Sequence, residues 1–164
     1  MVTTFAVKNM FGCVSGKQKA LWHFTKGKNV SDFCELLIEI FRFLKPALTI
    51  IDAVTVMEGA GPINGRARPF GWLIGGVEPI ACETICCKLA DIDPSEVPII
   101  KKAREMSFGC CDFEKIEIAG DGFPEKVCTD FELPRLIPLR FSLPHVFRSI
   151  ARQILLLAKV KKTE

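Results

Sequence analysis

The stretch from residue 51 to residue 72, IDAVTVMEGAGPINGRARPFGW, gathers the side chains best suited to chemistry. A short β-branched run predicts a strand that carries Asp52 toward its carboxyl end, where ligands of open α/β sheets usually bind. Backbone N–H groups of glycine-rich loops, together with arginine, suit phosphate or carboxylate. We therefore expect an anionic small molecule in the loop that follows, between residues 58 and 71. The expected ligand-binding residues there are Gly59, Gly61, Gly65, Arg66 and Arg68, with Asp52 and Glu58 as acid/base or metal-binding groups.

Two familiar phosphate motifs are excluded in this loop. A Walker A loop needs a terminal Gly-Lys-Ser/Thr, which is missing. In a dinucleotide fingerprint Gly59 and Gly61 would fill the first two glycine positions, but the third falls on Asn64. The alternative interpretation is an ordered loop that uses glycine and proline only for its turns.

A second candidate group lies near the N-terminus, in the run VKNMFGCVSGKQKALWH. Lys8 and Asn9 are a donor pair for a ligand, and His23 is a candidate general base or metal ligand. A histidine beside Trp22 and Phe24 also fits a partly buried structural role. The sequence cannot place His23 next to the two carboxylates.

The chain has eight cysteines, but no Cys-x-x-Cys spacing and no apolar signal core at its start. We therefore expect free thiols in a reducing, cytoplasmic compartment. Cys82 and Cys86 lie four residues apart on a predicted helix and are weak candidates for a metal site. The same positions suit small core side chains, so no metal site is predicted with them.

Charge is unevenly distributed along the 164 residues. Residues 1–30 carry +5 without any acidic side chain, residues 31–132 carry −8, and residues 133–164 carry +6. A predicted last helix, residues 144–161, has Arg148, Arg152 and Lys159 on one side. Such a helix either docks on a membrane or partner, or packs as an ordinary core helix with a basic outer face.

Hydrophobic periodicity predicts an α/β fold: a layered, mixed or mainly parallel sheet flanked by helices, with a C-terminal amphipathic helix. The expected family-like domain covers residues 1–120, and residues 121–164 form a proline-rich loop and the last helix on the same domain. Within the first region the predicted elements are a short helix over 17–24, a helix over 32–44 capped by Asp32, strands over 48–56 and 71–77, helices over 79–90 and 98–106, and an edge strand over 113–119.

These motifs resemble the family called domain of unknown function 362. Its pattern has a Lys-Asn-x-x-Gly stretch ending in His, a strand bearing Asp, a Met-Glu-Gly-x-Gly-Pro loop and a helix closing on Asp-Pro-x-x-Val-Pro. The resemblance covers residues 1–120, and the matching positions are Lys8, Asn9, Gly12, His23, Asp52, Glu58, Gly59, Gly61 and Pro62. Glu83 stands where the family commonly has Asp. The resemblance also implies a stretch before the Lys-Asn motif and cluster-binding cysteines after the domain; neither is found here, so the chain is expected to be the later part of the domain.

The resemblance implies an iron–sulfur-associated, redox-linked protein of bacteria or archaea with no agreed activity. The first functional prediction is therefore a cytoplasmic domain that binds an anionic small molecule, with Asp52, Glu58 and His23 as catalytic candidates. An iron–sulfur cluster is expected only in a flanking segment or a ferredoxin-like partner. The alternatives are a non-catalytic module that docks an electron-transfer partner or a membrane surface through its basic C-terminal helix, and a cysteine-based metal protein. We expect no nucleic-acid partner.

Overall fold

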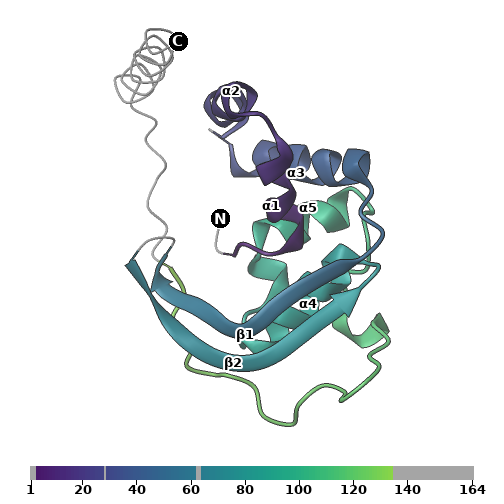
Figure 1. The fold of residues 1–164 in the computed structure, drawn as a ribbon. Coiled ribbons are helices and arrows are strands. Elements are labelled where there is room, and N and C mark those ends of the chain that lie inside the picture. The colour runs from purple at the N-terminus through teal and green to yellow at the C-terminus, as the bar shows by residue number, and fades with distance from the viewer. Residues whose placement is uncertain (1–2, 28, 62–63, 135–164) are drawn as a thin grey trace, which may run out of the picture.

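The computed structural model describes residues 3–27, 29–61 and 64–134. Two short helices and one longer helix come first, a long β-hairpin follows, and two further helices come after it (Figure 1). In chain order the elements are α1 (Ala6–Asn9), the 3₁₀ turn η1 (Met10–Cys13), α2 (Gly16–Lys26), α3 (Val30–Leu44), β1 (Thr49–Ala60), β2 (Asn64–Gly76), α4 (Pro79–Leu89), η2 (Pro94–Glu96), α5 (Pro98–Glu105) and η3 (Phe113–Lys115). The last predicted helix, residues 144–161, lies outside the described residues.

The core is built mainly from helices. Most of the apolar stripe of α3 is buried or half-buried, as its periodicity predicts, with Leu37 and Ile38 fully enclosed, whereas Leu44 at its end is 38% exposed. This helix begins earlier than expected, because the side chain of Asn29 accepts a hydrogen bond from Ser31 N at 2.9 Å and caps it in place of Asp32. Two more predicted helices are confirmed as α4 and α5, each with a proline at its start.

Helix α4 lies between the hairpin and the other helices (Figure 1). Because both of its sides are covered, eight of its eleven residues are buried. Gly76 of β2 approaches it closely: a Cβ atom there would come within 2.8 Å of Cys82 Sγ. The helix therefore supports the hairpin at the end where β2 finishes, around Gly76.

The sheet differs from the prediction. Among the described residues it has two strands, β1 and β2, which pair antiparallel in one ladder, so a mixed or mainly parallel sheet is not observed. The predicted loop over residues 58–71 is mostly strand, with Glu58 opposite Arg66 and Gly59 opposite Gly65. The two strands pair residue by residue through this stretch, and their ladder hydrogen bonds outweigh the turn-forming tendency of the glycines.

The predicted edge strand over residues 113–119 is wrong. Residues 113–115 form the 3₁₀ turn η3, and residues 116–119 have no regular secondary structure. The ring of Phe113 packs edge-on against Phe123 at 4.9 Å, and no strand lies alongside to supply ladder hydrogen bonds to this part of the described chain. Alternation of apolar and charged residues does not produce a β-strand when no neighbouring strand pairs with its backbone.

Residues 121–134 contain no helix or strand, with a turn at residues 129–130, and return to the rest of the fold. Cys128 N donates to Leu89 O at 3.0 Å, which joins this segment to the end of α4. Phe131 then packs against Phe70 of β2 with ring centroids 5.7 Å apart. The segment therefore reaches the hairpin close to its turn.

Candidate functional site

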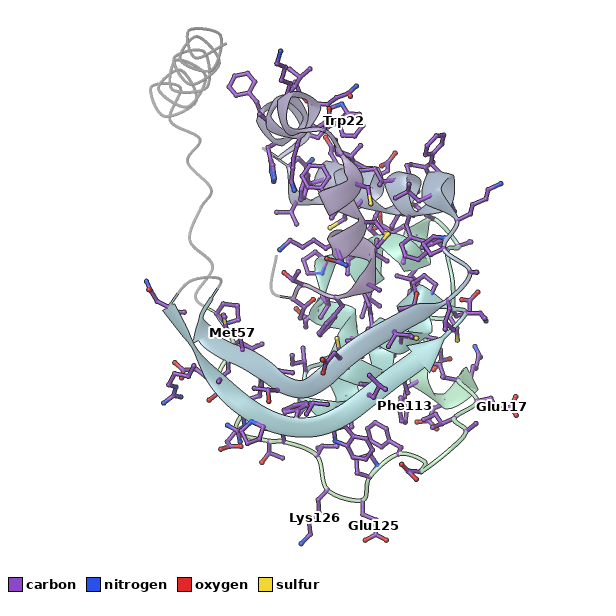
Figure 2. All side chains as sticks on the ribbon, viewed as in Figure 1. Trp22, Met57, Phe113, Glu117, Glu125 and Lys126 are labelled. Carbon is purple, nitrogen blue, oxygen red and sulfur yellow. The ribbon has the colours of Figure 1, made fainter. Side chains whose placement is uncertain are left out.

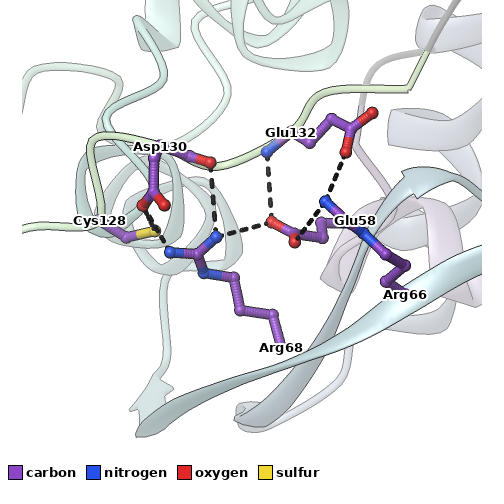
Figure 3. A network of polar contacts seen from close by, with 6 residues as sticks. All are labelled: Glu58, Arg66, Arg68, Cys128, Asp130 and Glu132. Carbon is purple, nitrogen blue, oxygen red and sulfur yellow. Dashed lines mark hydrogen bonds and ion pairs between the residues drawn. The ribbon is translucent and has the colours of Figure 1, made fainter.

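Glu58 is the centre of a polar network near the turn of the hairpin (Figure 3). Its side chain is buried, with 6% of the residue exposed. Its two carboxylate oxygens accept from Arg66 Nη2 at 3.3 Å and from Arg68 Nη1 at 3.1 Å. The backbone N–H of Glu132 donates to the same carboxylate at 3.3 Å. Three donors therefore converge on one buried carboxylate.

The two arginines also bind carboxylates of the extended segment. Arg66 Nη2 lies 2.7 Å from Glu132 Oε2, and Arg68 Nη2 forms an ion pair with Asp130 Oδ1. The network thus contains two guanidinium groups and three carboxylates. Its positive charges are compensated within the protein, and the network fastens residues 130–132 to the hairpin.

The pKa values of these groups follow from the same contacts. Burial raises the pKa of Glu58, but the hydrogen bonds from Glu132 N–H and Arg68 and the charges of both arginines outweigh it, so the pKa is lowered overall. The pKa of Asp130 is lowered chiefly by its hydrogen bond to Arg68, and the pKa of Arg68 is raised by its bonds to Asp130 and Glu58. These shifts favour the charged forms of Glu58, Asp130 and Arg68.

The glycine amides of the predicted loop are used inside the protein. Gly59 N donates to Glu132 O at 2.7 Å, and Gly61 N donates to Gly59 O at 2.8 Å. Gly65 is needed for close packing, since a Cβ atom there would lie 2.3 Å from Met57 Cγ and 2.8 Å from Glu58 O. These glycines shape the turn and admit neighbouring atoms.

Asp52 takes no part in the network. It is exposed on β1, and its Oδ1 accepts from Val54 N at 3.0 Å, a local contact within the strand. The structure therefore brings Glu58, Arg66 and Arg68 together and leaves Asp52 outside.

The N-terminal candidates lie on the short helices. Lys8 and Asn9 belong to α1, and Lys8 Nζ donates to Thr4 Oγ1 at 2.6 Å. His23 belongs to α2, which lies at the top of the molecule in Figure 1, whereas the end of the hairpin that joins β1 to β2 lies at its left edge. His23 thus lies apart from Glu58, Arg66 and Arg68, whereas α1, which carries Lys8 and Asn9, packs against β1.

His23 sits among aromatic rings. It stacks on Phe33 at 5.0 Å between centroids and meets the ring of Phe11 edge-on at 4.9 Å. Burial lowers its pKa, and the nearby charges of Lys19 and Lys8 lower it further. This favours the neutral imidazole.

The cysteines of α4 are buried. Burial is the first cause that raises the pKa values of Cys82, Cys86 and Cys87, in the last case to about 12. A protonated, enclosed thiol packs as a small apolar group and is a poor metal ligand. Within residues 3–27, 29–61 and 64–134, no cluster of three or more His, Cys, Asp and Glu side chains is arranged to hold a metal ion.

Sequence reasoning missed Asp130 and Glu132. Both lie in the segment predicted as an extended loop, two residues apart, and they meet Arg66 and Arg68, which are also two residues apart in β2. The two acids have the same spacing along the chain as Arg66 and Arg68, and that matching spacing of opposite charges is the signal that could have found them.

Glu83 is the other buried acid of note. It is 1% exposed in α4, and its Oε1 accepts from Val7 N at 2.8 Å, which holds α1 against α4. Burial raises its pKa to about 7, although the hydrogen bond from Val7 acts in the opposite direction. Near neutral pH this carboxyl exists in both protonation states.

Comparison with known proteins supports the family suggested by the motifs. The domain of unknown function family DUF362 matches residues 1–88. The protein named "Thylakoid-associated protein sll1697", from Synechocystis sp., is 33% identical over 155 residues. That alignment covers 91% of this chain but 46% of the Synechocystis protein, so the chain spans just under half of that relative's length. No solved structure matches the chain. Since the family pattern matches more than half of its residues, the chain belongs to the DUF362 family of domains of unknown function.

Proposed function

We propose that this chain attaches peripherally to an anionic membrane surface and that α2 makes the contact. The observation that supports this proposal most directly is the position of α2: none of its eleven residues is buried. A helix that contributes no enclosed side chain to the core is available for a surface role.

The charge of α2 suits an anionic surface. Lys17, Lys19 and Lys26 lie on it, and none of them forms an ion pair with any acid in the part of the chain that the structure describes. The whole of residues 1–30 contains no acidic side chain. Each lysine held near an anionic membrane contributes about 1 kcal/mol. At about 100° per residue Lys17 lies on the opposite side of α2 from Lys19 and Lys26, so a flat surface meets at most two of the three, and they strengthen binding by up to roughly thirtyfold.

The apolar side chains near α2 fit the same role. Leu21 is 56% exposed on α2, and Val30, at the start of α3, is 49% exposed. Basic helices that lie on membranes place such side chains at the headgroup boundary. No described helix is long and apolar enough to span a bilayer, so the proposed contact is with the surface. The Synechocystis relative is named for its association with thylakoids, and we extend a membrane-associated role to this chain.

Vesicle sedimentation tests the proposal. The chain should pellet with vesicles of phosphatidylglycerol and phosphatidylcholine, and far less with phosphatidylcholine alone. Replacing Lys17, Lys19 and Lys26 by glutamine should weaken binding to the anionic vesicles by up to roughly thirtyfold, and 0.5 M salt should weaken the wild type in the same direction.

A matched control changes the same charge elsewhere. Lys101, Lys115 and Lys126 are exposed, and Lys126 lies far from α2, near the opposite end of the molecule (Figure 2). Their replacement by glutamine should reduce binding several-fold less than the change on α2. Equal losses in both variants would show that only net charge matters. Loss of binding on deleting residues 144–164, with the α2 variant still bound, would assign the contact to the C-terminal segment and reject our proposal.

The other predictions from the resemblance remain predictions. An iron–sulfur partner and a redox role rest on the family resemblance alone. An anionic small molecule at the hairpin would have to displace carboxylates that already bind Arg66 and Arg68. For this reason the membrane role is the function that we put first.

A further inference from the structure

One face of the hairpin exposes a row of large apolar side chains. Side chains alternate between the two faces of a strand, and the buried residues Thr49 and Ala53 mark the face toward the protein, where Gly76 meets α4. The opposite face, which we call the outer face, carries six large apolar side chains that are 53–73% exposed: Leu48, Ile50, Val54, Met57, Leu73 and Val77. Soluble monomers rarely expose so many apolar side chains side by side, so the outer face is a candidate interaction surface.

The outer face carries very little charge. Asp52 is the one charged residue on it within the described parts of β1 and β2. Glu58, Arg66 and Arg68 occupy the alternate positions of the strands and belong to the polar network. Such a face offers no charge complementarity to a nucleic acid, an acidic peptide or a lipid headgroup. Its matching partner is another uncharged, apolar surface.

The outer face is complementary in shape to itself. In the antiparallel register Ile50 lies opposite Gly75, and Met57 lies opposite Ala67. Bulky side chains therefore stand on β1 where β2 has small ones. A two-fold rotation about an axis along the strands places β1 of one copy over β2 of a second copy. Ile50 then meets Gly75 of the second copy, Met57 meets its Ala67, and the same contacts repeat in the other direction.

The size of the outer face also fits a dimer. Its six large side chains expose on the order of 500 Å² of apolar surface. An interface of standard size buries about 800 Å² on each partner, of which about 60% is apolar, so the two areas agree. The strands have 12 and 13 residues and are therefore about 40 Å long, and face-to-face packing of two sheets is a common arrangement.

We propose that the outer face of the hairpin binds the same face of a second copy of this chain, in a symmetric dimer whose two-fold axis runs along the strands. The four strands then form two sheets packed face to face, with the apolar side chains between them. Asp52 lies opposite Leu73 in the register, so it meets Leu73 of the second copy. Its Oδ1 accepts from Val54 N, and the carboxylate still loses water in the dimer. The contact does not involve α2 and is independent of the membrane role.

Sedimentation velocity of the full chain, from about 1 to about 100 µM, tests the proposal, and a dimer should form within this range. Leu73→Ser and Ile50→Ser remove exposed apolar side chains, so each should weaken the dimer by about tenfold or more. Asp52→Asn removes the one charge on the outer face and should tighten the dimer. Ile118→Ser, which changes an exposed apolar side chain outside the hairpin, should leave the association unchanged.

Two charge variants test the arrangement of the copies. Met57→Lys and Ala67→Glu should each reduce self-association, because each places a charge inside the interface. An equimolar mixture of the two should recover it, since the lysine of one chain then lies beside the glutamate of the other. A wild-type chain that is monomeric at about 100 µM would overturn the proposal, and so would a mixture that associates no better than its components. Weaker vesicle binding of Leu73→Ser, with a monomeric wild type, would assign the outer face to a lipid surface instead.

Discussion

Replacing Glu83 with glutamine should abolish a pH dependence of folding stability that the wild-type chain has between about pH 5 and pH 7. The carboxyl is buried in α4, and its pKa rises from the usual 4.5 to about 7 because burial disfavours the charged form. The folded chain therefore binds a proton that the unfolded chain has already released in this range.

The sign and size follow from that difference. Stability from this group is fully present below the unfolded pKa of 4.5 and is lost as the pH rises to the folded pKa of about 7. At about 1.4 kcal/mol for each pH unit, the loss amounts to roughly 3 kcal/mol. Above pH 7 both states are deprotonated and the contribution no longer changes.

Other groups must be separated from this effect. The pKa of His23 is lowered, which makes stability rise with pH toward 6.5 and so opposes the effect of Glu83. The buried thiol of Cys34, whose pKa burial raises to about 11, stays protonated throughout. The difference between wild type and Glu83→Gln therefore isolates the carboxyl.

The assay is urea unfolding of both proteins at pH 5, 6, 7 and 8. The glutamine oxygen can still accept the hydrogen bond from Val7 N, so the variant should fold. The free energy of unfolding of the variant minus that of the wild type should be larger at pH 8 than at pH 5 by roughly 3 kcal/mol. Glu125→Gln, a change at an exposed acid, should run parallel to the wild type (Figure 2). If the Glu83→Gln and wild-type stabilities also run parallel with pH, the burial argument is refuted.

Two further predictions concern the hairpin. Gly65→Ala places a Cβ atom against Met57 Cγ and should destabilise the chain by about 1–3 kcal/mol in thermal unfolding. Gly12→Ala is the control, because a Cβ atom there has nothing within 4 Å, and it should change stability far less. Similar effects at both positions would contradict the packing argument. Asp130→Asn combined with Glu132→Gln removes from the network two carboxylates that bind the guanidinium groups of Arg66 and Arg68. If the hairpin binds anions, phosphate should therefore raise the melting temperature of this variant more than that of the wild type. No response to phosphate in either protein would reject the predicted anion site.

The sequence by itself determined the helices with strong periodicity. The apolar stripe from Phe33 to Phe41 can bury itself only as one face of a helix, and the prolines at residues 79 and 98 mark where the next helices begin. The motif residues also identified the family, because they are a local pattern that needs no knowledge of distant contacts.

Tertiary structure decided the hairpin and the site. Glycines at residues 59, 61 and 65 predict a loop when only local tendencies count, but pairing of β1 with β2 satisfies the backbone over nearly the whole stretch. From the sequence, Arg66 and Arg68 predict an anion-binding site. In the structure they pair with Asp130 and Glu132, which lie more than sixty residues away in the chain. Which acid pairs with which arginine depends on the path by which residues 130–132 come back to the hairpin. A pattern among neighbouring residues in the sequence does not specify that path.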